Sequence, residues 1–169
     1  NAACNFCYAT MQASTGSKGK EITREIAFQF LEDAAAIGVK GVSLISDGES
    51  SIVPFYADSI EHGAKQGLQM GIGTNGFVLR KPILEKILPH LSYFRYNFTG
   101  GTQEGLSRIM GVKPEMFNIT VQNVTDAMEI KRRNNYNVTI NMQFVCDPKE
   151  VAELIPFAHQ VAKIRPDYG

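Results

Sequence analysis

Two cysteines near the start of the chain, Cys4 and Cys7, have the spacing that most directly predicts chemistry. With two residues between them, both thiols can reach one small volume, as in zinc sites, iron–sulfur clusters and dithiol/disulfide pairs. The third cysteine, Cys146, lies far along the chain in a different kind of segment. The pair is therefore incomplete for a four-thiolate site. The missing ligands must come from upstream, from histidine or from a non-protein ligand.

Two other uses of the cysteine pair stay open. A redox couple of the thioredoxin type normally opens a helix directly, whereas residues 8–22 are rich in Gly, Ser, Thr and Lys. A structural zinc site would need Cys146 and one histidine, but the histidines have no paired metal-ligand spacing. These histidines are His62, His90 and His159. We interpret them as surface or cap residues, and Cys146 as a small buried thiol.

Short apolar strands alternating with amphipathic helices must position the cysteines. The strands are predicted at 41–46, 69–73, 93–98 and 138–145, where β-branched or aromatic residues gather. Helices are predicted over 27–34, from Pro54 to Gly67, from Pro82 to Pro89, over 121–128 and after Asp147. Strands that alternate with helices pair in parallel through right-handed crossovers. The sequence therefore predicts an α/β fold, either a doubly wound sheet or part of a (β/α) barrel.

The last predicted helix begins with a recognisable capping pattern. Asp147 and Glu150 flank Pro148 in the pattern of a capping box, with the proline at the first helical position. The apolar stripe behind this cap is predicted to be Val151, Leu154, Ile155, Ala158 and Val161.

Each predicted strand runs into a polar loop. In folds of this class ligands bind at the carboxyl ends of the strands. The loops are 46–50, 74–76, 97–101 and 146–147. Gly, Asn, Asp and Ser also make ordinary turns, but four such loops on one edge favour a site for a polar, zwitterionic small molecule.

The chain resembles the radical SAM superfamily over nearly all of its length. That family holds a [4Fe–4S] cluster through a C-x3-C-x-φ-C motif, in which φ is aromatic. The first seven residues are similar to this motif from its second position onward. Cys4 and Cys7 match the second and third ligands, and Phe6 matches the aromatic residue. The resemblance implies that a cysteine immediately precedes Asn1 and that residues 1–169 are a core domain truncated at both ends.

Three stretches at the strand ends resemble family landmarks. Residues 46–49 look like the G-G-E element, with Asp47 in place of the first glycine, and residues 74–76 match T-N-G. Residues 95–100 are similar to the element that contains S-x-D-G, with Asn97 for the serine and Thr99 for the aspartate.

Residues 104–111 correspond to a stretch that often ends in Arg-Gly, with Met110 in place of the arginine. The whole pattern is most similar to the group that carries a C-terminal auxiliary-cluster extension, the SPASM or twitch type. The fold implied is a partial (β/α)6 TIM-like barrel with parallel strands. The end of the chain, 165–169, looks like the approach to a sixth strand.

The resemblance implies two cofactors, a [4Fe–4S] cluster and S-adenosylmethionine. Glu49 and the backbone around Asp47 and Gly48 would bind the methionine ammonium, because carboxylate oxygens accept charge-assisted hydrogen bonds. Asn97 would contact the ribose hydroxyls, since an amide both donates and accepts. The peptide unit at Phe6 would meet the adenine edge.

The remaining implied roles involve residues on other elements. Arg108 is a candidate for the methionine carboxylate, and Gln143 would line the adenine or substrate side. Asn75, from the T-N-G match, also belongs to the implied cofactor site. Cys4 and Cys7 would be metal ligands. No residue is assigned a catalytic role of its own, since the cofactors carry the hard chemistry.

The implied activity is reductive cleavage of S-adenosylmethionine to a 5′-deoxyadenosyl radical that abstracts hydrogen from a substrate. A peptide, a protein or a small metabolite is the expected substrate, in a reaction of the oxidoreductase, maturase or transferase type. An electron donor such as flavodoxin or ferredoxin is the expected partner. The alternative is a structural zinc or thiol-redox module on an α/β barrel without radical chemistry.

Composition limits the other classes of function. The 169 residues, 44% of them hydrophobic, suit one domain with a sizeable core. The 17 basic and 17 acidic residues balance, which gives no electrostatic reason to expect nucleic acid or an anionic membrane. No apolar run approaches the roughly 20 residues of a spanning helix. Three cysteines, two of them closely paired, suggest a reducing compartment, and we expect a cytoplasmic location.

Overall fold

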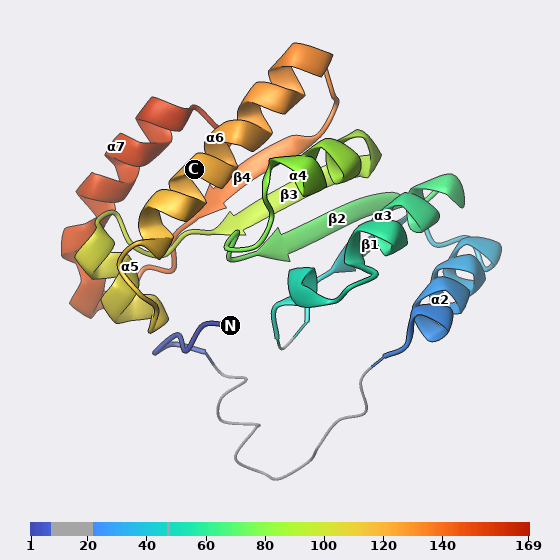
Figure 1. The fold of residues 1–169 in the computed structure, drawn as a ribbon, viewed down its shortest axis with the longest axis horizontal. Helices are drawn as coiled ribbons and strands as arrows, with labels where there is room; N and C mark the ends of the chain where they lie inside the picture. The colour runs from blue at the N-terminus through green and yellow to red at the C-terminus, as the bar shows by residue number, and fades with distance from the viewer. Residues whose placement is uncertain (8–21, 47) are drawn as a thin grey trace, which may run out of the picture.

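One sheet of four parallel strands forms the centre of the computed structural model, which describes residues 1–7, 22–46 and 48–169 (Figure 1). The strands are β1 (Gly41–Leu44), β2 (Gln69–Thr74), β3 (Leu91–Asn97) and β4 (Thr139–Gln143). They lie in the order β1-β2-β3-β4, and each pairs in parallel with the next. This confirms the predicted α/β fold, and the sheet remains open. Tyr168 adds a parallel bridge to Asn141, where the sequence predicts the approach to a further strand.

Helices cover one face of this sheet, and α3, α4 and α6 lie over it in Figure 1. The α-helices are α2 (Arg24–Ala36), α3 (Tyr56–Lys65), α4 (Lys81–Ile87), α5 (Gln103–Met110), α6 (Met116–Asn134) and α7 (Leu154–Ile164). Short 3-10 helices are η1 (Ser50–Ile52), η2 (Leu88–His90) and η3 (Pro148–Glu153). The short α5 begins after Thr102, whose hydroxyl accepts from Gly105 N, and ends at Gly111 in the left-handed conformation.

Strand alternation gives the sheet two different faces. The helix-covered face is apolar and buried, and its side chains are Met70, Ile72, Phe94, Tyr96, Ile140 and Met142. The opposite, inner face carries glycines and polar side chains, namely Gly71, Gly73, Arg95, Asn97, Asn141 and Gln143. The core therefore lies on the helical side of the sheet, and the inner face is left for polar chemistry.

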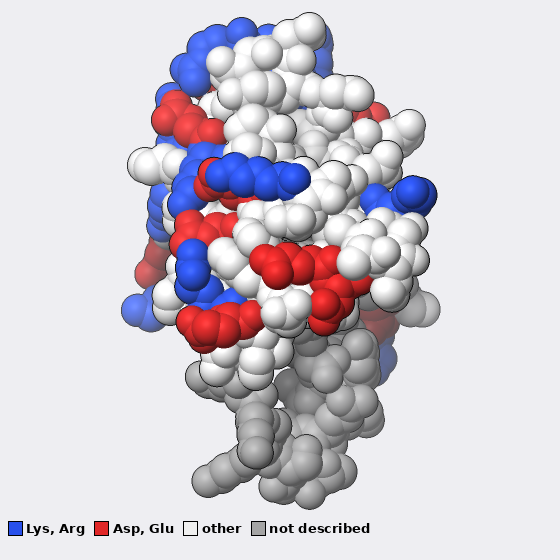
Figure 2. Space-filling view, turned by 90° about the vertical axis from the view of Figure 1, so that its right-hand side faces the viewer, with Lys and Arg blue, Asp and Glu red and all other residues white. Residues whose placement is uncertain are grey.

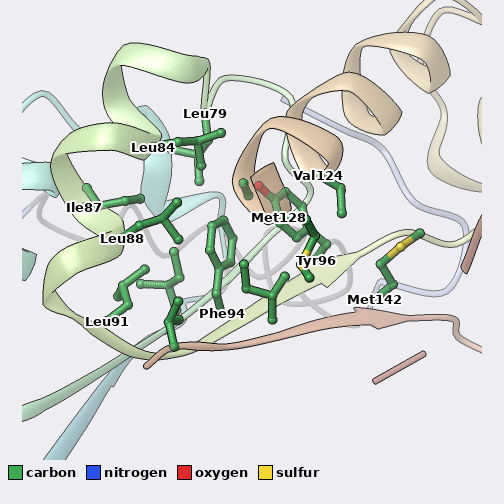
Figure 3. Close-up of a cluster of buried hydrophobic side chains, with 14 of the residues drawn as sticks. Leu79, Leu84, Ile87, Leu88, Leu91, Phe94, Tyr96, Val124, Met128 and Met142 are labelled. Carbon is green, nitrogen blue, oxygen red and sulfur yellow. The ribbon is translucent and has the colours of Figure 1, made fainter. Parts of the chain in front are cut away.

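The core joins β3 to two helices (Figure 3). Phe94 and Tyr96 stack with their ring centroids 4.3 Å apart, and both are fully buried. Leu84 of α4 and Val124 of α6 belong to the same buried cluster. Truncation of a buried aromatic side chain such as Phe94 to alanine typically destabilises a domain by about 3–5 kcal/mol. This packing fixes the position of β3, and with it the residues on the strand's inner face.

The apolar stripe predicted after Asp147 is wrong. Asp147 does cap, since its carboxylate accepts from Lys149 N at 2.9 Å, but the segment that follows is the 3-10 helix η3. Three residues per turn shift the register relative to an α-helix. Val151 and Ile155 are consequently 57% and 69% exposed. The buried residues of η3 and α7 are instead Glu150, Glu153, Phe157 and Ile164.

The surface shows no large single-sign area in the view of Figure 2, where acidic and basic side chains are interspersed. Within the described ranges, no helix is both long enough and apolar enough to cross a membrane.

Candidate functional site

A cavity of about 370 Å³ lies at the carboxyl ends of the strands, a size typical of small-molecule sites. The structure brings most of the predicted site residues together in its wall, namely Cys4, Phe6, Cys7, Gly48, Glu49, Asn75, Asn97 and Gln143. The wall also contains Asn1, Ala2, Ser46, Arg95, Met110 and Val145. Asp47, another predicted site residue, lies outside the described residues. Arg108 is the one described member of the predicted set that does not line this cavity.

The strand register explains why these polar side chains converge. Asn97 at the end of β3 pairs with Gln143 at the end of β4, so both amides stand on the same face and at the same level. Neither side chain makes a hydrogen bond to any of the described residues, which leaves both amides available to a ligand. One level deeper on that face, Arg95 pairs with Gly73 on one side and with Asn141 on the other.

The cysteine segment is held against the end of α5, as Figure 1 shows for the N-terminus. Ala3 N donates to the carbonyl of Met110 at 2.9 Å, and Asn5 N donates to that of Ile109 at 3.0 Å. Gly111 has φ +61°, and a Cβ there would lie 2.6 Å from Ala3 O. A glycine at this position thus allows both the helix ending and the close approach of the segment.

A tight turn brings the two cysteines to the same wall, since Cys7 N donates to Cys4 O at 3.1 Å. Burial, and next to it the proximity of Cys7, raises the pKa of the Cys4 thiol above its ordinary value. Each thiol must lose its proton to act as an iron ligand.

The zinc alternative lacks its other ligands in this arrangement. Among the described residues, no group of three or more His, Cys, Asp or Glu side chains is placed to hold a metal ion. Cys146 is exposed and does not line the cavity, so the interpretation of this thiol as buried is wrong.

Glu49 joins the loop after β1 to the end of β2. Its Oε1 accepts from the hydroxyls of Ser51 and Thr74, at 2.5 and 2.7 Å, and from Ser51 N at 3.3 Å. Its Oε2 accepts from Asn75 N at 2.9 Å. A carboxylate has about four acceptor positions, two on each oxygen, so Oε2 keeps one for a ligand. The side chain both builds the wall and presents one acceptor to the cavity.

Asn75 serves the loop itself. Its Oδ1 accepts from Phe77 N at 3.1 Å, and its Nδ2 donates to Asn1 Oδ1 at 2.7 Å. Asn75 is 7% exposed, so these bonds fix the turn after β2 and tie it to the cysteine segment. These two bonds leave one N–H and one acceptor position of the Asn75 amide uncommitted, so its predicted contact with the cofactor stays a prediction.

Arg108 lies in a separate cluster. Its guanidinium pairs with Glu150 and lies 3.8 Å from Glu153 Oε1. The buried Glu153 carboxylate also accepts from Gly101 N at 2.8 Å and from Thr102 N at 2.9 Å. The hydrogen bonds to Glu153 hold the loop that follows β3. The ion pair with Glu150 holds the Arg108 guanidinium outside the cavity wall.

Sequence reasoning did not assign Arg95 to the cavity. The signal was present, because a residue two positions before Asn97 on a strand shares its face. Tyr93, Arg95 and Asn97 alternate along β3 with the buried Phe94 and Tyr96.

The residues present suit a [4Fe–4S] cluster with S-adenosylmethionine. Two thiols, the ligands that iron–sulfur clusters use, stand in one wall of the cavity. A carboxylate with a remaining acceptor and two uncommitted amides stand around them, which suits an ammonium and hydroxyl groups.

Comparison with known proteins identifies the family of the chain. The family model of the radical SAM superfamily matches residues 1–155. A curated relative, the AdoMet-dependent heme synthase of Methanosarcina barkeri (strain Fusaro / DSM 804), is 34% identical over 88 residues. That match spans 51% of this chain and 25% of the heme synthase.

Solved structures share the fold. SuiB of Streptococcus suis superposes with a TM-score of 0.73 at 15% identity, over 98% of this chain and 35% of SuiB. A structure of TYW1 with a lysine-pyruvate adduct bound gives a TM-score of 0.68 at 14% identity, over 98% of this chain and 58% of TYW1. At these identities the likeness shows the fold alone, and the chain spans about a third of SuiB.

Proposed function

Because the chain belongs to the radical SAM superfamily, which uses a [4Fe–4S] cluster and S-adenosylmethionine, we propose that it forms the cofactor-binding core of a radical enzyme. One observation carries the proposal: Cys4 and Cys7 line the same cavity as Glu49, Asn97 and Gln143. When bound, the cluster and S-adenosylmethionine supply a 5′-deoxyadenosyl radical that abstracts hydrogen from the substrate.

The chain's own residues bind and orient. Cys4 and Cys7 provide two thiolates, and their turn against α5 sets the direction of both. The remaining acceptor on Glu49 Oε2 takes the methionine ammonium, in a carboxylate already held rigid by Ser51 and Thr74. Such preorganisation reduces the entropy lost on binding.

The other wall residues complete the cofactor site. The amides of Asn97 and Gln143 contact the ribose and the adenine or substrate side, and the peptide unit at Phe6 meets the adenine edge. Gly48 and the neighbouring Asp47 contribute backbone groups near the ammonium.

The substrate class is a peptide, a protein or a small metabolite, and the group is the SPASM or twitch type. One of the similar structures is SuiB bound to its precursor peptide SuiA, which supports a peptide among these choices. We propose an electron donor such as flavodoxin or ferredoxin, and a cytoplasmic location.

The test uses the full-length protein after anaerobic reconstitution with iron and sulfide. We expect at least about four irons per protein, and more where auxiliary clusters are present. We also expect broad visible absorption, and formation of 5′-deoxyadenosine and methionine with a strong reductant. Cys4→Ser and Cys7→Ser should lose both the cluster and the cleavage. Cys146→Ser is the matched control, because that thiol is exposed and outside the cavity, and it should behave as wild type.

Three results would contradict the proposal. Bound zinc without visible absorption favours the structural-zinc alternative, and a reversible Cys4–Cys7 disulfide with no deoxyadenosine favours the redox one. If Cys146→Ser loses as much cleavage activity as Cys4→Ser and Cys7→Ser, the two cavity thiols have no specific role in holding the cluster.

A further inference from the structure

Arg95 is the one basic side chain among the described residues that line the cavity. No acidic side chain in the described ranges forms an ion pair with it. Its Nε is buried and has no hydrogen-bond partner among the residues that the structure describes. Buried guanidinium N–H groups without an acceptor are unfavourable, so a ligand oxygen that accepts from Arg95 is correspondingly favoured.

The absence of a side chain at Gly73 leaves space for the Arg95 guanidinium. A Cβ at Gly73, the neighbour of Arg95 on β2, would lie 3.1 Å from Nη2 of the arginine and 3.1 Å from Ile45 Cδ1. Any larger residue at 73 would therefore compete with the arginine for the same space. On the other side Arg95 pairs with Asn141, another polar residue of the inner face. The planar fork of an arginine in such a position suits a carboxylate, which it binds through two parallel hydrogen bonds.

Arg95 lies below the level of the proposed cofactor contacts. It precedes Asn97 by two residues on the same strand, which places it about 7 Å deeper along the inner face. Glu49 and Asn97, in contrast, belong to the strand ends where the cysteine segment docks. A ligand group that contacts Arg95 thus belongs to a molecule that extends deeper into the cavity than the strand ends.

We propose that Arg95 binds a carboxylate of the substrate, which enters the cavity beside S-adenosylmethionine. This inference rests on the proposed function and narrows its substrate class to molecules that present a carboxylate near the reacting position. S-Adenosylmethionine carries a carboxylate as well, so the two sources are separated by experiment.

The first arm measures cofactor binding to the reconstituted full-length protein by calorimetry. Wild type, Arg95→Met and Arg95→Lys are titrated with S-adenosylmethionine and with its decarboxylated analogue. We expect less than about a twofold change in either affinity. A loss of affinity for S-adenosylmethionine alone, with the analogue unaffected, assigns the carboxylate to the cofactor and overturns the proposal.

The second arm uses propionate as the carboxylate probe and propionamide as its uncharged match, by saturation-transfer NMR with S-adenosylmethionine bound. Propionate should bind wild type and propionamide should not. Arg95→Met should weaken propionate binding by about tenfold or more, and Arg95→Lys by less, because lysine keeps the charge without the fork. The control is Arg133→Met, since Arg133 pairs with Glu85 on the surface and should leave propionate binding unchanged.

Equal propionate binding in wild type and Arg95→Met overturns the inference, as does equal binding of propionamide. Should Arg95→Met fail to fold, Arg95→Lys carries the same comparison. Formation of 5′-deoxyadenosine in wild type is recorded separately. If no 5′-deoxyadenosine forms, the proposed function is contradicted. If S-adenosylmethionine is cleaved normally but propionate is not bound in preference to propionamide, only the role of Arg95 is contradicted.

Discussion

The Glu153 carboxylate is expected to be one of the more sensitive single sites for stability, because it holds the loop after β3. It is 8% exposed and accepts from Gly101 N, Thr102 N and the Thr102 hydroxyl. Alanine at 153 leaves two backbone N–H groups without their acceptor, at about 1–3 kcal/mol each. We expect Glu153→Ala to lower the free energy of unfolding by about 3–5 kcal/mol. Glu153→Gln keeps one acceptor oxygen and should lose about 1–2 kcal/mol.

Gly105 provides a sharper form of the same test. A Cβ at this position of α5 would overlap the carboxylate of Glu153. Gly105→Ala should therefore destabilise the wild type by about 1–3 kcal/mol through overpacking. In the Glu153→Ala background the overlap disappears, and alanine should stabilise the helix by about 0.5–1 kcal/mol relative to glycine. The same substitution is thus expected to change sign.

Urea unfolding of the four proteins of this double-mutant cycle, followed by circular dichroism, measures the coupling. Additive effects would refute the reasoning, since they would mean that the two side chains do not compete for space. A loss below about 0.5 kcal/mol in Glu153→Ala would likewise show that the two N–H groups find other acceptors.

Three further predictions concern other regions. Gly111→Ala should strain the end of α5 and press on Ala3 O, which lowers both stability and iron content after reconstitution; Gly38→Ala has the same strain at φ +87° without a contact and should leave iron content unchanged. Tyr56→Phe should be neutral or stabilising by about 1 kcal/mol in thermal unfolding, because the buried Tyr56 hydroxyl has no hydrogen-bond partner in the described part of the chain; a clear loss of stability would reveal one. Burial raises the pKa of Asp167, but hydrogen bonds from Ile140 N and Lys131 outweigh it and leave the pKa below its ordinary value. The stabilising contribution of Asp167 is therefore present above about pH 4 and lost as pH falls through the lowered pKa; Asp167→Asn should flatten this acid limb of the unfolding midpoint, and an unchanged limb would contradict the assignment.

Much of the fold follows from the sequence. The strands could be predicted because each is a short apolar run bounded by glycine or polar residues, and their parallel pairing followed from the alternation with helices. The helix α5 was not predicted as a helix, since its eight residues are too few for a clear apolar period. The stripe after Asp147 was predicted wrongly because nothing in the residue pattern distinguishes a 3-10 turn from an α-helical one.

The candidate site divides along similar lines. Loop residues such as Glu49 and Asn97 could be placed together, because the ends of parallel strands share one edge. The position of Arg108 could not be foreseen, since its ion pair with Glu150 joins segments that only the tertiary fold brings together. Arg95 required knowledge of which face of β3 the helices cover, and hydrophobicity alone is ambiguous in a strand so rich in aromatic residues.

The docking of the cysteine segment on Met110 and Gly111 sets an order of events during synthesis. Each strand lies beside the next one in the chain, so the sheet can grow one strand–helix unit at a time as the polypeptide emerges. The cysteines, in contrast, leave the ribosome before α5, which provides their support. Their docked position becomes available only after α5 has formed, so cluster insertion into the ordered site follows assembly of the first three strands.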